Sequence, residues 1–121
     1  MTDDNKALLR EAGMDVSAAL ERFMNNDAML EKFLKKFRND PSYNELLEAV
    51  DARDNDRAFK AAHTLKGVAA NFSFETLRAA VSDQTECFRA GNLDDGIALM
   101  PRVADEYSKV ADALTKIFGE E

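Results

Sequence analysis

The sequence has little of what disulfide-bonded, membrane-spanning or turn-rich proteins need. Its only cysteine is Cys87, so no disulfide forms within the chain, and we expect a reducing compartment and no redox role for Cys87. Its apolar runs are a few residues long, whereas a membrane-spanning helix needs about 20, and the N-terminus does not resemble a signal peptide. Five glycines and two prolines leave little room for turns. These absences predict a cytoplasmic, helical protein.

The motifs of several enzyme classes are also missing. His63 is the only histidine, and no serine or cysteine forms a recognisable catalytic triad with it, which argues against an independent hydrolase. The sequence contains no Walker loop and no glycine-rich nucleotide loop. The acidic run at residues 51–56 lacks the glycine and the final glutamate of an EF-hand loop. We therefore expect no metal, no cofactor and no independent catalytic site.

Positive charge is scarce in this chain. Lys and Arg number 16 against 23 Asp and Glu, which gives a formal net charge of −7. Such a charge opposes binding to a polyanion, so nucleic acid and anionic membranes are poor partners. A length of 121 residues with 45% hydrophobic residues predicts one domain over 1–121 with a core of its own, and we expect a monomer.

Hydrophobic residues recur with helical spacing along the whole chain, and no run alternates as a strand does. This apolar stripe is clear at residues 27–38, where Phe33 and Phe37 belong to the apolar side of the expected helix. Short connections between consecutive helices require antiparallel packing. The sequence thus predicts an all-α protein, an up-down antiparallel four-helix bundle with short extra N-terminal helices. We expect the N-terminal helices within about 4–38, and bundle helices at about 27–38, 41–53, 55–72, 74–90 and 93–118, the last kinked or split near Pro101.

The helix at 55–72 places its histidine away from the predicted core. With an advance of about 100° per residue, one face carries five residues, and the opposite face carries the large apolar side chains. The exposed face is thus predicted to consist of Phe59, His63, Lys66, Gly67 and Ala70. A histidine on this face is accessible to a partner, although an ordinary exposed histidine has the same pattern.

Lys66 and Gly67 have both a functional and a structural interpretation. Lys66, one turn after His63, offers a cation for a phosphoryl group on the imidazole, or is a solvated surface lysine. A glycine inside a helix costs about 1 kcal/mol relative to alanine, so Gly67 needs a reason. Close approach by a partner's backbone is one reason, and a helix-packing contact is the other.

The run His63-Thr64-Leu65-Lys66-Gly67-Val68-Ala69-Ala70-Asn71-Phe72 resembles the signature of histidine-containing phosphotransfer (HPt) domains. The similarity extends to residues 13–23, 30–37 and 89–92, and so covers most of the chain. The resemblance implies a four-helix bundle and a phosphorelay intermediate of two-component signalling. In that role His63 would accept a phosphoryl group from a receiver-domain aspartyl phosphate and pass it to another receiver. Lys66 would stabilise the phosphoryl group and Gly67 would give the partner access.

The chain departs from the family pattern just after this motif. Ala70 and Ser73 stand where family members often have glycines, and the bulky Phe74 follows. We expect a docking surface formed by Phe59, Ala70 and Phe74. A changed docking specificity follows from these differences, while the phosphoryl acceptor is retained.

The position from which family members often hydrogen-bond the second nitrogen of the histidine ring is also different. Family members have Gln or Glu there, and this chain has Thr85. Gln84, one residue earlier on the inner stripe, is an alternative donor that would fix the tautomer of His63. A buried glutamine satisfied by backbone groups is an equally good interpretation.

The resemblance also implies partners. They are the receiver domain of a response regulator, a hybrid sensor histidine kinase, or both, with Mg²⁺ held by the receiver and not by this chain. Two other functions stay open: a helical adaptor that binds a receiver without being phosphorylated, and a histidine domain of a chemotaxis-type kinase. Phosphate uptake distinguishes the phosphorelay intermediate from the adaptor, because an adaptor would bind equally well with His63→Gln.

Overall fold

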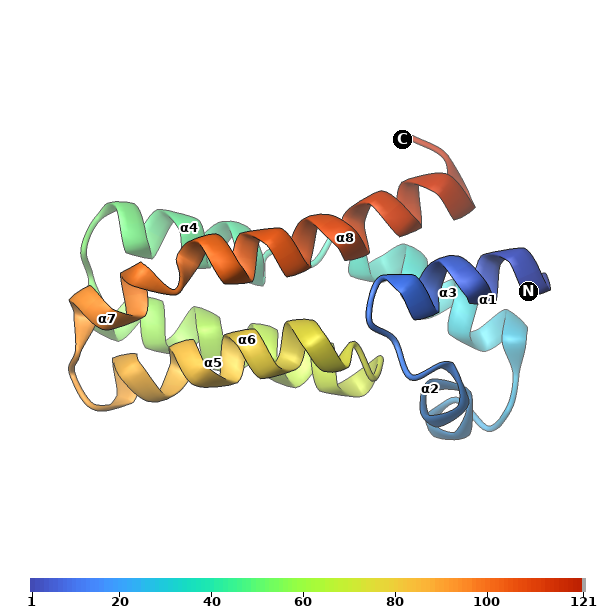
Figure 1. Cartoon of the computed structure of the whole chain (residues 1–121), viewed down its shortest axis with the longest axis horizontal. Helices are drawn as coiled ribbons and strands as arrows, with labels where there is room; N and C mark the ends of the chain where they lie inside the picture. Colours follow the sequence, from blue (N-terminus) through green and yellow to red (C-terminus); the bar gives the residue numbers. More distant parts are fainter. Residues whose placement is uncertain (121) are drawn as a thin grey trace.

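The computed structural model describes residues 1–120, and within them the chain forms helices joined by short turns (Figure 1). The one β feature in this range is an isolated antiparallel bridge between Met14 and Phe74. No helix in the described range is long and apolar enough to cross a membrane. The helices are α1 (Asp3–Glu11), α2 (Val16–Arg22), α3 (Asp27–Phe37), α4 (Ser42–Asp51), α5 (Asn55–Asn71), α6 (Glu75–Arg89), α7 (Leu93–Ala98) and α8 (Met100–Phe118).

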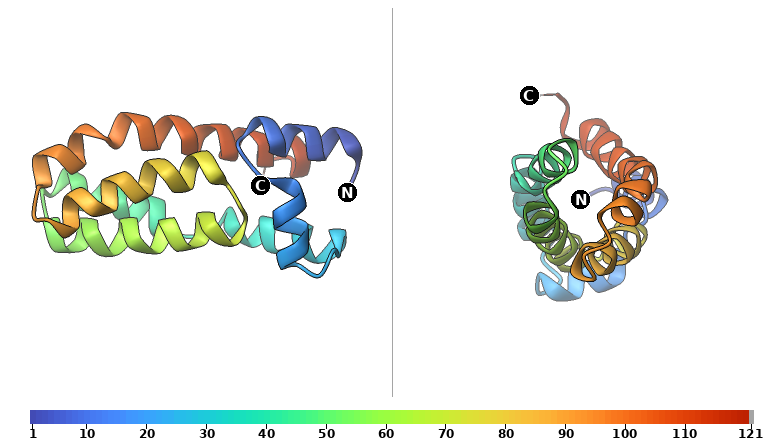
Figure 2. Two further views of the ribbon diagram at one scale, coloured as in Figure 1. Left: turned by 60° about the horizontal axis from the view of Figure 1, so that its bottom comes forward. Right: turned by 90° about the vertical axis from the view of Figure 1, so that its left-hand side faces the viewer.

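Four long helices form the bundle. Helices α4, α5, α6 and α8 lie side by side, with α7 closing one end and α1, α2 and α3 gathered at the other (Figures 1 and 2). Helices α4, α5, α6 and α8 alternate in direction along the bundle, and the view along the axis shows the helices arranged around a common core (Figure 2). The prediction of an all-α helical bundle with short N-terminal helices is confirmed.

The last predicted helix is divided in two. Helix α7 ends at Ala98 and α8 begins at Met100, so the break lies at Leu99 and Pro101 is the second residue of α8. Proline suits that position because its missing N–H has no partner in the first turn of a helix. Gly96 of α7 packs so closely on Phe88 of α6 that a Cβ there would overlap the ring. The break therefore lets α7 lie across the end of the bundle.

The α5–α6 turn is joined to the α1–α2 loop by main-chain hydrogen bonds. The N–H of Asp15 donates to the carbonyl of Ser73 at 2.8 Å, and the N–H of Glu75 donates to the carbonyl of Gly13 at 2.9 Å. Gly13 has φ +99°, and a Cβ on it would collide with the hydroxyl of Thr76. Ser73 also has a positive φ, of 52°. We call these paired segments, residues 13–15 and 73–75, the loop clasp.

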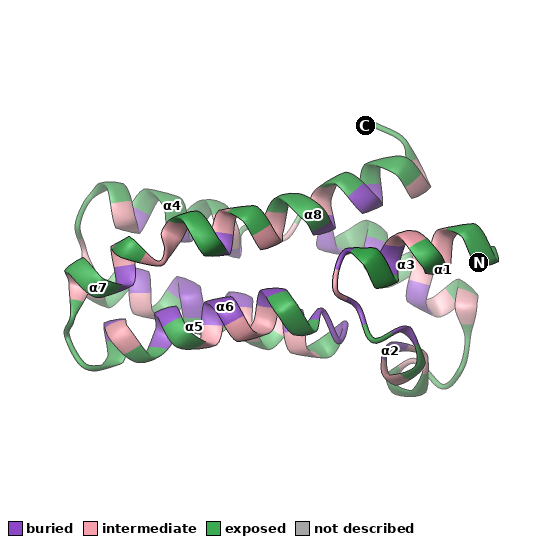
Figure 3. Cartoon of the chain, in the orientation of Figure 1, coloured by how far each residue is buried: buried purple, intermediate pink, exposed green. Residues whose placement is uncertain are grey.

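Aromatic rings fill the core beside the loop clasp. Phe37 of α3 lies 5.6 Å from Phe72 and 5.7 Å from Phe74, measured between ring centroids, and Phe23 lies 5.6 Å from Phe72. Buried residues lie where the helices face one another, as Figure 3 shows in purple. This packing attaches the N-terminal helices to the bundle, because each large side chain buried there contributes about 1.5–3 kcal/mol.

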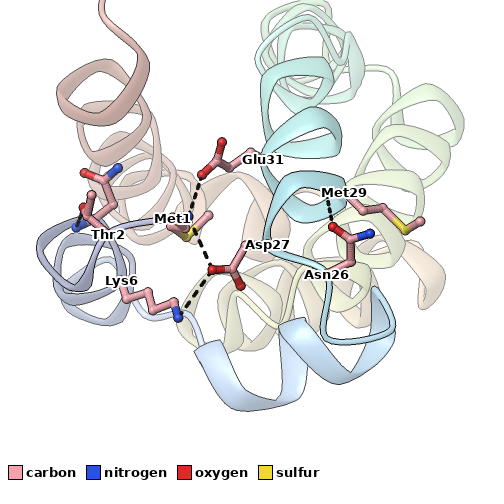
Figure 4. Close-up of polar contacts among 8 residues, drawn as sticks. Met1, Thr2, Lys6, Asn26, Asp27, Met29 and Glu31 are labelled. Carbon is pink, nitrogen blue, oxygen red and sulfur yellow. Dashed lines mark hydrogen bonds and ion pairs between the residues drawn. The ribbon is translucent and has the colours of Figure 1, made fainter.

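The N-terminal amino group makes a further polar connection to α3. The nitrogen of Met1 lies 3.3 Å from Oδ2 of Asp27 and 3.1 Å from Oε1 of Glu31, and Lys6 lies 3.7 Å from the same Asp27 oxygen (Figure 4). Hydrogen bonds to Glu31 and Asp27 raise the pKa of this amino group. The contacts hold the start of α1 against α3.

Candidate functional site

His63 lies on the outward face of α5. Its side chain is exposed, whereas Leu65 on the opposite side of the helix is 1% exposed. The predicted orientation of this helix is therefore confirmed. The orientation follows from the sequence, because alanines and leucines of α5 occupy the inner face and leave the histidine at the surface.

Phe59, one turn before His63, lies against the imidazole. The two ring centroids are 5.8 Å apart and the ring planes differ by 18°, which is a stacked arrangement. Phe59 is half-buried, and the guanidinium carbon of Arg89 lies 4.9 Å from its ring centroid. Among residues 1–120 no side chain forms a hydrogen bond to the imidazole. The histidine ring is thus held by an aromatic contact, with its nitrogens open to a partner.

Gly67, one turn after His63, has no neighbour that requires a glycine. A Cβ built on Gly67 would meet nothing within 4 Å, and the residue is exposed. The packing interpretation of this glycine is therefore wrong for the isolated chain. The helix carries a cost of about 1 kcal/mol for a glycine that no contact among residues 1–120 explains.

Lys66 and Ala70 flank this open site on the same helix. Both are half-buried. Within the described part of the chain Lys66 takes part in no ion pair, although many other surface cations here do. Its ammonium group is thus available to an anion near His63.

Phe74 does not belong to this surface. It is 0% exposed and packs on Phe37 and Phe72, so the prediction that Phe74 forms part of the docking surface is wrong. The reason is the loop clasp, in which Phe74 pairs with Met14 and turns its ring into the core.

Gln84 and Thr85 are also directed away from His63. Nε2 of Gln84 donates to the carbonyl of Gly96 at 3.0 Å, and the hydroxyl of Thr85 donates to the carbonyl of Val81 at 2.7 Å. Both side chains are fully buried. Of the two interpretations of Gln84, the buried glutamine bonded to a backbone carbonyl is the one found, and neither Gln84 nor Thr85 hydrogen-bonds the imidazole.

A groove that sequence reasoning missed lies beside the C-terminal half of α5. It has a volume of about 570 Å³, and its walls include Val68 and Asn71, which lie within about two helical turns of His63. Phe33, which the periodicity assigned to the inner side of its helix, is 37% exposed in this groove. The aromatic and charged side chains of the groove are Phe23, Phe33, Phe37, Phe72, Arg22, Lys36 and Asp40.

The cations of this groove stand out on an acidic protein. Nζ of Lys36 lies 5.1 Å from the centroid of Phe33, so charge and aromatic surface are combined. The net charge of the chain is −7. The sequence feature that corresponds to this groove is the pair Lys35-Lys36 close to Phe33. A helical wheel places both lysines on a solvated face and does not indicate a groove.

The chain matches the family model of the Hpt domain over residues 28–113, which is well over half of its length. The chain belongs to the Hpt domain family. Comparison with curated proteins and with solved structures gave no match. Hpt domains are phosphocarriers that act through a histidine in two-component phosphorelays and interact with receiver domains and histidine kinases.

Membership gives this Hpt domain a histidine phosphotransfer role. Helix α5, with the exposed ring of its single histidine, lies inside the matched range. Over the residues that the structure describes, no group of three or more His, Cys, Asp or Glu is placed to hold a metal ion. Cys87 is half-buried on α6 as a free thiol.

Proposed function

We propose that this Hpt domain is a phosphorelay intermediate that carries its phosphoryl group on His63. It accepts the group from an aspartyl phosphate of one receiver domain and passes it to the aspartate of another. The observation that carries the proposal is the combination of an exposed imidazole with an adjacent helical glycine that meets nothing within 4 Å. A phosphoryl donor has to reach a ring nitrogen closely, and a missing side chain one turn away admits its backbone.

The transfer is a displacement at phosphorus. The lone pair of one ring nitrogen of neutral His63 attacks the phosphorus atom, a P–N bond forms, and the P–O bond to the aspartate breaks and returns a carboxylate to the receiver. Lys66 then lies near the phosphoryl oxygens and offsets their charge. Mg²⁺ is held by the receiver in this proposal, and the Hpt domain supplies no cofactor.

The phosphohistidine is expected to be stable because no general base among the described residues lies beside the ring. A general base beside the imidazole would activate water against the P–N bond. No carboxylate among residues 1–120 pairs with His63. The site is suited to holding and handing on a phosphoryl group, and hydrolysis is left to the partner.

The receiver of a response regulator, or that of a hybrid sensor histidine kinase, is the partner we propose. Its contact surface centres on His63, includes Phe59, Gly67 and Ala70, and continues into the groove beside Val68. An apolar side chain flanked by a carboxylate on the receiver would fit the aromatic wall and the cations of Arg22 and Lys36.

Intact mass spectrometry tests this function. The wild-type chain and His63→Gln are each mixed with a phosphorylated receiver and Mg²⁺, and each is weighed before and after acid treatment. We expect one acid-labile phosphoryl group on the wild type and none on the variant. If the wild type gains none from several receivers that bind both proteins equally, the chain is a non-phosphorylated adaptor and the proposal is wrong.

A further inference from the structure

Phe59 contacts His63 on one side and Arg89 on the other. The imidazole and the phenyl ring stack with centroids 5.8 Å apart, and the guanidinium carbon of Arg89 lies 4.9 Å from the phenyl centroid. Phe59 and His63 are one turn apart on α5, whereas Arg89 is the last residue of α6. Two helices therefore meet at the ring that supports the histidine.

The α6 end of this series is fixed by polar contacts. Nε of Arg89 donates to Oε2 of Glu86 at 3.0 Å, which limits the guanidinium to one region over the phenyl ring. Nδ2 of Asn55 donates to the carbonyl of Phe88 at 2.9 Å and so ties the first turn of α5 to the last turn of α6. The phenyl ring thus rests on a surface that both helices hold in place.

Stacking and hydrogen bonding orient an imidazole in different ways. The lone pair that attacks phosphorus lies in the plane of the ring and points outward from its edge. A stacked neighbour fixes the plane and leaves both nitrogens free, whereas a hydrogen bond fixes the plane by occupying one nitrogen. Here the buried donors of Gln84 and Thr85 are used by backbone carbonyls, so stacking is the contact that orients His63.

We propose that Phe59 and Arg89 are positioning residues for phosphoryl transfer. Phe59 holds the plane of the His63 ring so that a nitrogen faces the incoming phosphorus, and Arg89 holds Phe59 through its cation–π contact. The role in transfer rests on the proposed function of His63. The orientation of the ring is a property of the unphosphorylated chain and is measurable without a partner.

NMR of the histidine ring tests the orientation. Because His63 is the only histidine, its two carbon-bound ring protons give one pair of signals, which the stacked phenyl ring shifts upfield. We expect Phe59→Leu to remove this upfield shift and to slow transfer from a phosphorylated receiver by roughly tenfold, because a small misplacement of a reacting group is costly. Phe59→Tyr keeps the ring and is expected to retain both properties.

A matched pair of arginine variants tests the second contact. Arg78 pairs with Glu75 at 3.1 Å with the same three-residue spacing on α6 as Arg89 and Glu86. The described residues give Arg78 no aromatic contact. We expect Arg89→Ala to move the His63 signals and to slow transfer by about two- to fivefold, the size expected of an exposed cation–π contact, and Arg78→Ala to change neither.

Two results would overturn the inference. One is a Phe59→Leu protein whose His63 signals and transfer rate equal those of the wild type. The other is an Arg89→Ala protein that behaves as Arg78→Ala does. If the wild type accepts no phosphoryl group, the proposed function fails and the role in transfer fails with it. The ring signals then still show whether the stack exists, so the two failures are distinguishable.

Discussion

Gly67 on α5 and Gly96 on α7 are both glycines inside helices, but their surroundings differ. A Cβ on Gly67 would meet nothing within 4 Å, whereas a Cβ on Gly96 would overlap the ring of Phe88. Gly96 is explained by the packing of this chain alone. No contact among residues 1–120 explains Gly67, which is consistent with the proposal that it admits a partner.

The same contrast separates two regions of the molecule. Around the loop clasp, aromatic rings at 5.6–5.9 Å and main-chain hydrogen bonds account for the residues present. On the outward face of α5, an unpaired lysine, an exposed histidine and an open glycine follow one another within two turns. A feature that costs stability and has no internal contact to offset it indicates a function, and the following predictions test that distinction.

The largest effect is expected where packing is tightest. Phe74→Ala removes a fully buried ring and is expected to lower the free energy of unfolding by about 3–5 kcal/mol, measured by chemical denaturation. The fraction that remains folded should still bind a receiver as the wild type does. A Phe74→Ala protein of normal stability that has lost receiver binding would show that Phe74 is a surface residue after all.

The two glycines provide a matched pair with opposite signs. Gly96→Ala is expected to destabilise the protein by about 1–3 kcal/mol, because the new methyl group overlaps Phe88. Gly67→Ala is expected to stabilise it by about 1 kcal/mol through helix propensity while slowing phosphoryl transfer. Denaturation and transfer rates are measured on the same samples. Equal transfer by Gly67→Ala and the wild type would contradict the idea that Gly67 admits the partner.

Reversing charge at the groove should slow association with a receiver at a modest cost in stability. For the double variant Arg22→Glu and Lys36→Glu, we expect the association rate with a receiver to fall on the order of tenfold. The free energy of unfolding should fall by about 1–2 kcal/mol, because Lys36 loses its contact with Phe33 and both side chains are cations in the last turn of a helix. Lys116→Glu on α8, beside α1, is the control. Because the control changes the net charge by half as much, a fall of about threefold in the control would point to net charge and not to the groove.

The smallest effect concerns two stacked tyrosines on the other side of the bundle. Tyr43 and Tyr107 lie 3.8 Å apart between ring centroids. Burial raises the pKa of both, and the charge of Asp40 raises that of Tyr107 further. A raised pKa means that the folded state holds the phenol proton more tightly. The stabilisation is therefore complete below the ordinary pKa of about 10 and is lost as pH rises through the folded-state pKa.

Absorbance of the phenolate measures this directly, because the chain has no tryptophan. We expect the titration midpoints of the two tyrosines to lie above 10 in the native protein and near 10 in denaturant. Tyr107→Phe should remove one of the two raised midpoints. A native titration identical to the denatured one would show that this region is as open to solvent as the outward face of α5.

The periodicity of the sequence predicted the parts that depend on one helix at a time. The inner alanines and leucines of α5 determine which side His63 faces, so its exposure follows from the helix geometry. The spacing of apolar residues and the short connections likewise predicted the bundle. The sequence alone could not decide between the two interpretations of Gly67, because they differ only in what lies next to its Cα.

The features that the sequence did not determine all depend on contacts between different segments of the chain. Phe74 is buried because its turn pairs with residues 13–15, some 60 positions earlier in the chain. Gln84 faces a carbonyl of α7, a helix whose break from α8 is not encoded by hydrophobic spacing. The groove needs three helices to form its walls. A pattern read along one helix contains none of these relations.

The loop clasp makes the folding unit longer than the segment that defines the family. The family match begins at residue 28, whereas the carbonyl of Ser73 and the N–H of Glu75 are satisfied by Asp15 and Gly13. A fragment of residues 28–113 would lose both partners and uncover Phe74, and unpaired backbone groups at a buried site are costly. The first 27 residues are thus an integral part of this domain's fold, and the helix that carries His63 is anchored through them.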